Sequence, residues 1–238
     1  MALAINCDMG EGFGLYRIGD DAAIMPFITM ANVACGFHAS DPSVMHKTIR
    51  LAKEHGVKVG AHPSLPDLQG FGRRAMAISP AEVTDLVTYQ TGALAAFLQA
   101  ENMPLNHVKP HGALYGMAAR DGAIAAAIAK AVKPFGVPVL GMAFTAQEKA
   151  YAENGVEMVG EFYADLEYDG EGNLILSRVH DAVDPVQARE RVQRVIREGK
   201  VRTTAGRDIP VKAGSVCVHS DTPGAAEIAA ELARSLRQ

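Results

Sequence analysis

The sequence is poor in cysteine, in long apolar runs and in segments that would direct it out of the cell. Its three cysteines, Cys7, Cys35 and Cys217, are an odd set, and each lies in an apolar, strand-like run. A disulfide framework is therefore not expected, and a reducing cytoplasm fits better. No apolar run approaches the roughly 20 residues that span a bilayer. Residues 1–8 lack a charged start and reach Asp8 too soon for a signal peptide, so we expect no membrane association.

Positive charge is scarce as well. The chain has 23 Lys and Arg against 27 Asp and Glu, a net charge of −4. Nucleic-acid-binding proteins usually carry a clustered basic face, so a nucleic-acid partner is not expected. The basic run 189–200 spaces Val192, Val195 and Ile196 at helical intervals and is predicted to be a solvated helix face.

Several short catalytic motifs are also missing. There is no GxxxxGK[ST] phosphate loop, and Gly10, Gly12 and Gly14 lack the GxGxxG spacing of dinucleotide sites. No GxSxG elbow supports Ser64 as a nucleophile. Cys35 is expected to be a buried strand residue and not a nucleophile. No HxxxH or HExxH element marks a compact metal site.

What the sequence does contain is an alternation of strand and helix patterns. The predicted strands are 3–8, 30–35, 57–61, 107–109, 138–142, 156–162 and 215–219. The predicted helices are 41–54, 79–100, 121–133, 145–153, 185–198 and 223–236. This order favours a parallel sheet with helical crossovers. A chain of 238 residues suits one (β/α) barrel, so we expect a single barrel domain over residues 1–238.

Helix start signals support these boundaries. Asp41-Pro42, Ser79-Pro80 and Asp184-Pro185 each place a capping side chain before a first-turn proline, and Glu82 completes a capping box with Ser79. Segments 168–178 and 201–213 break the rhythm. The first is predicted to be a turn with a short extended piece, and the second a hairpin with Gly206 in its turn.

Ionisable residues gather just after the predicted strands, where an α/β barrel places its active site. Six strand ends contribute to this set, which comprises Asp8, Glu11, His38, His62, Lys109, His111, Glu161, Asp165, His219 and Asp221. Four of the eight histidines belong to it. The other four are expected to be structural or surface residues: His46, His55, His107 and His180.

Two kinds of chemistry suit this set. Aspartate with several histidines can bind a divalent metal that activates water, and the metal ligands would then be Asp8, His38 and His62. The same set without a metal suits general acid–base work, with Lys109 neutralising an oxyanion or phosphoryl group. The spacing cannot decide, because the residues come from separate strands.

Five separated motifs carry a family resemblance: NCDMGEGFG (6–14), ANVACGFHASDP (31–42), GAHPSLPDLQGFGRR (60–74), KPHGALYG (109–116) and CVHSDTPGA (217–225). Together they resemble the LamB/YcsF family, described as the A subunit of 5-oxoprolinase. The resemblance implies a seven-stranded (β/α) TIM-like barrel of the glycoside hydrolase/deacetylase type. It also implies an ATP-dependent enzyme that opens the lactam of 5-oxo-L-proline to L-glutamate, together with 5-oxoprolinase subunits B and C. ATP would be a co-substrate, and a divalent metal such as Mg²⁺ with ATP is compatible with this chemistry.

Residue roles follow as hypotheses from this resemblance. Lys109 would offset phosphate or oxyanion charge, histidines 38, 62 and 111 would donate hydrogen bonds or protons, and carboxylates 8, 11 and 221 would position water or a ring N–H. The chain departs from the family pattern at Ser40 and Ser220, where glycine is usual, at Gly116 (asparagine) and at Leu166 (arginine). The alternatives are a metal-dependent deacetylase-like hydrolase and a non-catalytic metabolite-binding regulatory subunit.

Overall fold

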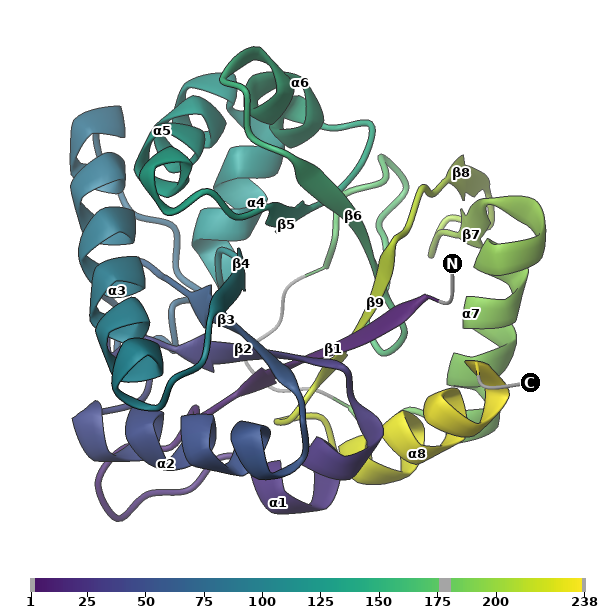
Figure 1. Cartoon of the computed structure of the whole chain (residues 1–238). Coiled ribbons are helices and arrows are strands. Elements are labelled where there is room, and N and C mark those ends of the chain that lie inside the picture. The colour runs from purple at the N-terminus through teal and green to yellow at the C-terminus, as the bar shows by residue number, and fades with distance from the viewer. Residues whose placement is uncertain (1–2, 176–180, 237–238) are drawn as a thin grey trace.

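Seven parallel strands close into a barrel (Figure 1). The structure, a computed structural model, describes residues 3–175 and 181–236. The barrel strands are β1 (Ala4–Met9), β2 (Met30–Ala34), β3 (Lys58–His62), β4 (Leu105–Val108), β5 (Val139–Gly141), β6 (Met158–Tyr163) and β9 (Ser215–His219). Each pairs with the next, and β9 closes the ring by pairing with both β6 and β1. The predicted seven-stranded TIM-like barrel is therefore confirmed.

Helices surround this ring. They are α1 (Asp21–Ile24), α2 (Pro42–Glu54), α3 (Pro80–Ala100), α4 (Gly112–Arg120), α5 (Gly122–Val132), α6 (Ala146–Glu153), α7 (Pro185–Glu198) and α8 (Ala225–Leu236), with 3₁₀ turns η1 (Met25–Phe27) and η2 (Lys133–Phe135). The predicted caps form: the side chains of Asp41 and Asp184 accept backbone N–H groups, and Ser79 forms a capping box with Glu82. Among the described helices, none is both long and apolar enough to cross a membrane.

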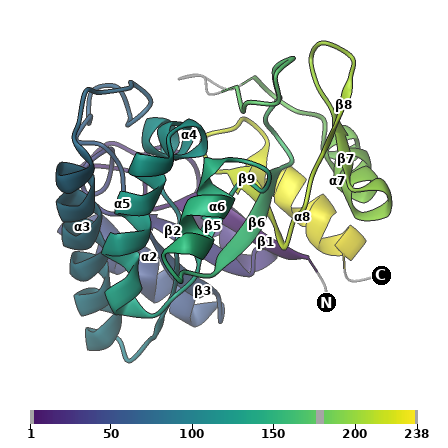
Figure 2. The ribbon, with the colours of Figure 1, turned by 90° about the horizontal axis from the view of Figure 1, so that it is seen from above.

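The two interruptions of the β/α order lie between β6 and β9. Segment 201–213 contains the predicted hairpin, formed by β7 (Lys200–Arg202) and β8 (Asp208–Pro210), with Gly206 at φ +75° in its turn. Tyr168 and Leu174 form an antiparallel bridge around the predicted turn, and residues 176–178 and His180 lie outside the described residues. Figures 1 and 2 show α7 beside α8. On α7, Val192 and Val195 are buried and Ile196 is exposed, whereas Arg189, Arg191 and Arg194 are half-buried in ion pairs, so the predicted basic face is only partly solvated.

The barrel lumen is polar, and this follows from the alternation of side chains along each strand. On β1, Ile5, Cys7 and Met9 belong to the apolar core. The intervening Asn6 and Asp8 are also buried, and they hydrogen-bond to side chains of the neighbouring strands β9 and β2. The strand is therefore hydrophobic on its helix-facing side and polar on its lumen-facing side.

A chain of hydrogen bonds links the buried polar side chains inside the barrel. Asn6 Nδ2 donates to Ser215 Oγ over 2.7 Å, and Asn32 Nδ2 donates to Asn6 Oδ1 over 2.7 Å. The same Asn32 amide donates to Asp8 Oδ1 over 2.7 Å. His107 Nε2 donates to Asn32 Oδ1 over 2.6 Å. His107, predicted to be structural, is thus part of the lumen packing.

Gly60 on β3 makes room for the His107 ring. A Cβ atom at position 60 would lie 2.3 Å from the imidazole atoms of His107. We expect Gly60→Ala to lower the free energy of unfolding by about 1–3 kcal/mol, the usual cost of overpacking. Chemical denaturation measures it. The control Gly92→Ala, in open space on α3, should instead stabilise the protein by about 0.5–1 kcal/mol. Equal effects of the two variants would contradict the steric explanation.

The buried imidazole of His107 should make the stability of the protein depend on pH. Burial, followed by repulsion from Lys109, lowers its pKa to about 3. The unfolded chain takes up a proton near pH 6.5, whereas the folded chain does not until about pH 3. Stability linked to His107 is therefore complete above pH 6.5 and is lost as the pH falls toward 3, at up to about 1.4 kcal/mol per pH unit. Urea unfolding of wild type and His107→Gln between pH 7 and 4.5 should give a shallower slope for the variant.

Candidate functional site

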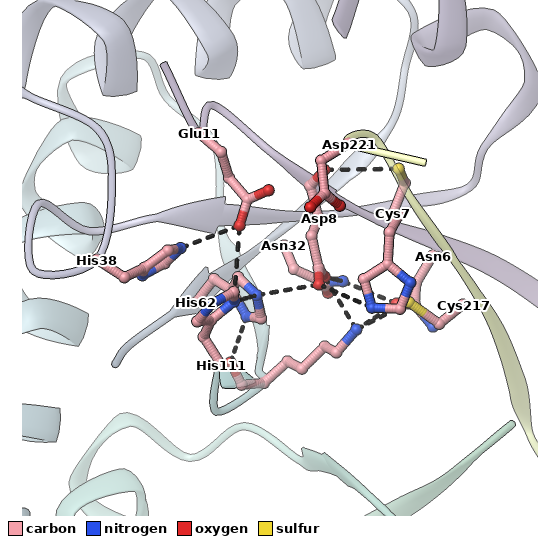
Figure 3. A network of polar contacts seen from close by, with 12 residues as sticks. Asn6, Cys7, Asp8, Glu11, Asn32, His38, His62, His111, Cys217 and Asp221 are labelled. Atoms are coloured by element: carbon pink, nitrogen blue, oxygen red, sulfur yellow. Dashed lines mark hydrogen bonds and ion pairs between the residues drawn. The ribbon is translucent and has the colours of Figure 1, made fainter. Parts of the chain in front are cut away.

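The predicted site residues converge at the carboxyl ends of the strands. Asp8, His62, Glu161 and His219 lie on strands β1, β3, β6 and β9, and the others lie in the loops that follow the strands. Nine of the ten are buried, and the side chain of Asp221 is 13% exposed. Figure 3 shows Glu11, His38, His62, His111 and Asp8 pointing toward one another. The structure therefore brings the ten predicted residues together at one end of the barrel.

Lys109 is the cation at the centre of the site. Its Nζ lies 2.9 Å from Asp8 Oδ1 and 3.1 Å from Glu161 Oε1, and it donates to Cys217 Sγ over 2.9 Å. Burial opposes the charge, but Asp8, with Cys217 and Glu161, outweighs it and raises the pKa of Lys109 well above its ordinary value. Burial likewise opposes ionisation of Asp8, yet His62 and Lys109 hold the pKa of Asp8 well below its usual range. The site therefore contains a buried ammonium–carboxylate pair.

Glu161 belongs to the same arrangement. Tyr163 donates its hydroxyl to Glu161 Oε2 over 2.7 Å, while Oε1 faces Lys109. The Tyr163 ring also lies 5.4 Å from Lys109 Nζ, which places the cation against an aromatic ring. Glu161 and Tyr163 therefore hold the ammonium group in position from the β6 side.

Three histidines and Glu11 form a second group beside this pair. His38 Nε2 lies 3.0 Å from Glu11 Oε1, and His62 Nε2 lies 3.0 Å from His111 Nδ1. His111 Nδ1 also lies 3.6 Å from Glu11 Oε1. The rings of His38 and His111 stack with centroids 3.7 Å apart. One ligand atom from each of the four residues lies within 4.8 Å of all the others.

The pKa values of this group are displaced by burial. Burial, then the charge of His62, lowers the pKa of His38 well below its ordinary value. Burial, with the charges of His38 and His62, lowers the pKa of His111 in the same way. Burial and then Asp8 raise the pKa of Glu11 well above the usual range. Burial is the largest cause for each of these three groups, and it disfavours the charged form of all three.

Asp165 acts through His219. It accepts hydrogen bonds from the backbone N–H of His219 (2.8 Å), from His219 Nδ1 (3.0 Å) and from the Thr222 hydroxyl (3.0 Å). The opposite nitrogen, His219 Nε2, lies 3.7 Å from Asp8 Oδ2. Burial opposes the charge of His219, but Asp165 outweighs it and raises the pKa of His219. Asp165 is thus a positioning residue, which sequence position could not distinguish from a catalytic one.

A narrow hollow, partly open to solvent, leads to these groups. Asp8, His62, Lys109, His111 and His219 line it, and so do residues that the sequence did not single out, namely Arg73, Tyr115, Tyr163 and Leu174. Arg73 Nη1 binds Asp221 Oδ2 over 2.9 Å, and this side chain is only 3% exposed. The one available signal for Arg73 was the Gly-Phe-Gly-Arg-Arg ending of the family motif at 60–74.

The structure also places the weaker candidates. Burial raises the pKa of Cys35 to about 12, which does not suit a thiolate nucleophile. Ser64 Oγ has no hydrogen-bond partner among the described residues, so no base activates it there. All three cysteines are free, as expected. Asp8 groups with Cys217 and His219, whereas His38 and His62 group with Glu11 and His111. The ligand set Asp8, His38 and His62, considered as an alternative to a site without metal, is therefore divided between two groups.

A profile of the LamB/YcsF family matches residues 3–238. This chain belongs to the LamB/YcsF family. It is 48% identical, over 98% of its length, to the 5-oxoprolinase A subunit of Bacillus licheniformis, of which it covers 94%. Over 94% of its length it is 46% identical to the lactam utilization protein lamB of Emericella nidulans, of which it covers 90%. The crystal structure of a lactam utilization protein from Thermus thermophilus is 44% identical, with a TM-score of 0.91 and coverage of 100% and 97% of the two chains.

The structure shows the surroundings of two positions at which this LamB/YcsF chain departs from the family pattern. Ser40 has φ +76°, a left-handed backbone that favours the glycine usual at this position. Its N–H donates to Gly12 O over 2.7 Å, which holds the His38 loop against the Glu11 loop. Leu166, where arginine is common in the family, lines the hollow together with Arg73. A guanidinium group is therefore present there despite the departure.

Proposed function

We propose that this chain is a subunit of an ATP-dependent 5-oxoprolinase. The complete enzyme would convert 5-oxo-L-proline, ATP and two water molecules to L-glutamate, ADP and phosphate. Subunits B and C would complete the assembly. The observation that carries this proposal is the full-length similarity to proteins named as the A subunit of 5-oxoprolinase, at 47–48% identity.

The chemistry of the site supports this proposal. A five-membered lactam is a stable amide, and transfer of a phosphoryl group to its oxygen makes the ring carbon electrophilic toward water. Lys109 would face the phosphate oxygens, since a buried cation stabilises developing negative charge strongly in a low-dielectric site. The Asp8 carboxylate, 2.9 Å from that cation, would orient the attacking water or the ring N–H. Attack by one water and cleavage of the C–N bond would give γ-glutamyl phosphate, and a second water would hydrolyse this acyl phosphate to glutamate and phosphate.

Arg73 is suited to bind the carboxylate that 5-oxoproline carries beside its ring. Its guanidinium lines the hollow and lies 4.8 Å from the centre of the Phe71 ring. Bidentate Arg–carboxylate pairs are strong and orient their ligand. We expect Arg73→Gln to raise KM for 5-oxoproline by roughly 10- to 100-fold, the loss of about 1.5–3 kcal/mol from a charged hydrogen bond. Steady-state assays measure it, with the surface variant Arg120→Gln as control.

The deciding assay combines the purified chain with subunits B and C, 5-oxoproline and ATP. Glutamate and ADP formed in equal amounts, and only in the complete mixture, are the expected products. Omitting this chain must abolish both. A mixture of B and C that forms glutamate without this chain would contradict the proposal, and stimulation that survives Lys109→Ala would assign this chain a regulatory role instead.

A further inference from the structure

Two backbone carbonyl groups determine the orientation of two histidine rings in the site. His62 Nδ1 lies 2.7 Å from the carbonyl oxygen of Lys109, and His111 Nε2 lies 2.8 Å from that of Phe71. A carbonyl oxygen only accepts, so each of these nitrogens carries the proton. In a neutral ring the other nitrogen then has a lone pair. His62 Nε2 and His111 Nδ1 are those nitrogens, and they face each other at 3.0 Å.

Two facing lone pairs repel unless a positive species lies beside them. Glu11 Oε1 and His38 Nε2 converge on the same place, so that the four ligand atoms lie within 4.8 Å of one another. The second carboxylate oxygen, Glu11 Oε2, is buried and finds no hydrogen-bond partner among the described residues. An unpaired buried carboxylate oxygen is costly in an otherwise well-bonded site.

We propose that Glu11, His38, His62 and His111 form a binding site for one divalent transition-metal ion. Three imidazole nitrogens and one carboxylate suit Zn²⁺, Mn²⁺ or Fe²⁺, whereas Mg²⁺ and Ca²⁺ prefer oxygen ligands. The N–H···O=C bonds of His62 and His111 are the outer contacts that usually orient metal-binding histidines. Figure 3 shows the four side chains directed toward a common centre.

The alternative to a metal ion is a proton shared between the nitrogen atoms of His62 and His111. A proton on His62 Nε2 would bridge to His111 Nδ1 at 3.0 Å or to Asp8 Oδ2 at 3.2 Å. It would satisfy that one pair and would engage neither Glu11 nor His38. A metal ion at the centre engages all four residues. The geometry therefore favours the metal, and this inference does not depend on the identity of the substrate.

The position of the site connects it to the reaction centre. His62 and His111 also line the hollow that contains Lys109 and Asp8. A metal held here would supply Lewis acidity at one edge of that hollow. The Lys109–Asp8 pair would remain the charged group at the other edge.

The test measures metal content and affinity, not activity. The full chain, without an affinity tag and never exposed to chelator, is analysed for bound metals. Metal-free protein is then titrated with Zn²⁺, Mn²⁺ and Co²⁺ in the presence of millimolar Mg²⁺. We expect about one equivalent of transition metal per chain, an increase in thermal midpoint on binding, and Co²⁺ absorption bands of nitrogen–oxygen coordination.

Two variants and one control make the result specific. His38→Asn and His111→Asn should each weaken binding by more than about 100-fold, beyond the usual effect of an outer contact. His46→Asn removes a histidine that binds Glu101 at the surface, and it should leave affinity unchanged. His38 contacts only Glu11 through its ring nitrogens among the described residues, so its variant should fold, which circular dichroism verifies. A folded wild-type chain that binds none of the three metals stoichiometrically, or variants that bind them like wild type, would overturn the proposal.

Discussion

Replacing Lys109 by methionine is expected to lower the free energy of unfolding by about 3–5 kcal/mol, the usual effect of breaking a buried ion pair from one side. The side chain is 2% exposed and lies between Asp8 and Glu161. Methionine fills a similar volume but leaves two carboxylates buried without their cation. The proposed reaction would be lost as well, because no other side chain places a cation at that point among the described residues.

Denaturant unfolding measures the change in stability, and a double variant identifies its origin. Lys109→Met/Glu161→Gln should be more stable than Lys109→Met alone. In the double variant, only Asp8 is left as a buried carboxylate without the Lys109 cation, because glutamine at position 161 is neutral. Lys149→Met, at an 80% exposed position on α6, should change stability by less than about 0.5 kcal/mol. A Lys109→Met protein as stable as wild type would refute the importance of the buried pair.

Asp8→Asn is expected to reduce the partner-dependent formation of glutamate and ADP by about 10²–10⁴-fold, the range typical for losing an acid–base group. Asparagine keeps the size of the side chain and can still accept from Asn32, but it removes the charge that faces Lys109 and His62. Initial rates with subunits B and C measure the effect, and Asp85→Asn on the exposed side of α3 is the matched control. Retention of wild-type rates by a folded Asp8→Asn chain would exclude Asp8 from the chemistry.

Much of the fold could be predicted from local signals. Proline after a capping side chain marked the starts of α2, α3 and α7, and apolar runs marked the strands. Helix α4 was not predicted, because His111 provides no side-chain cap to mark its start and because glycine, a poor helix former, occupies positions 112 and 116. Strand β4 begins and ends earlier than predicted, at Leu105–Val108 and not at 107–109. Lys109 nevertheless continues the pairing, since its N–H donates to Ala61 O over 2.8 Å.

The sequence could predict that the ten candidate residues lie close together, but not which of them contact one another. Strand ends meet in any (β/α) barrel, so position in the alternation was enough to select Asp8, His62 and His219. Whether Asp8 pairs with Lys109 or with a histidine depends on side-chain directions across the lumen, which the sequence does not encode locally. Arg73 was missed for a related reason. It lies in the long loop between β3 and α3, eleven positions after His62, and reaches Asp221 on the far side of the barrel.

The polar lumen also constrains how this protein can change during evolution. Asn32 donates to Asn6 and Asp8 and accepts from His107, so each of these side chains satisfies partners on other strands. An apolar substitution at any one of them leaves another buried polar group unpaired, which typically costs about 1–3 kcal/mol. Accepted changes at positions 6, 32, 60 and 107 should therefore occur together among homologues, as a correlated set, while the helix-facing positions of the same strands vary independently.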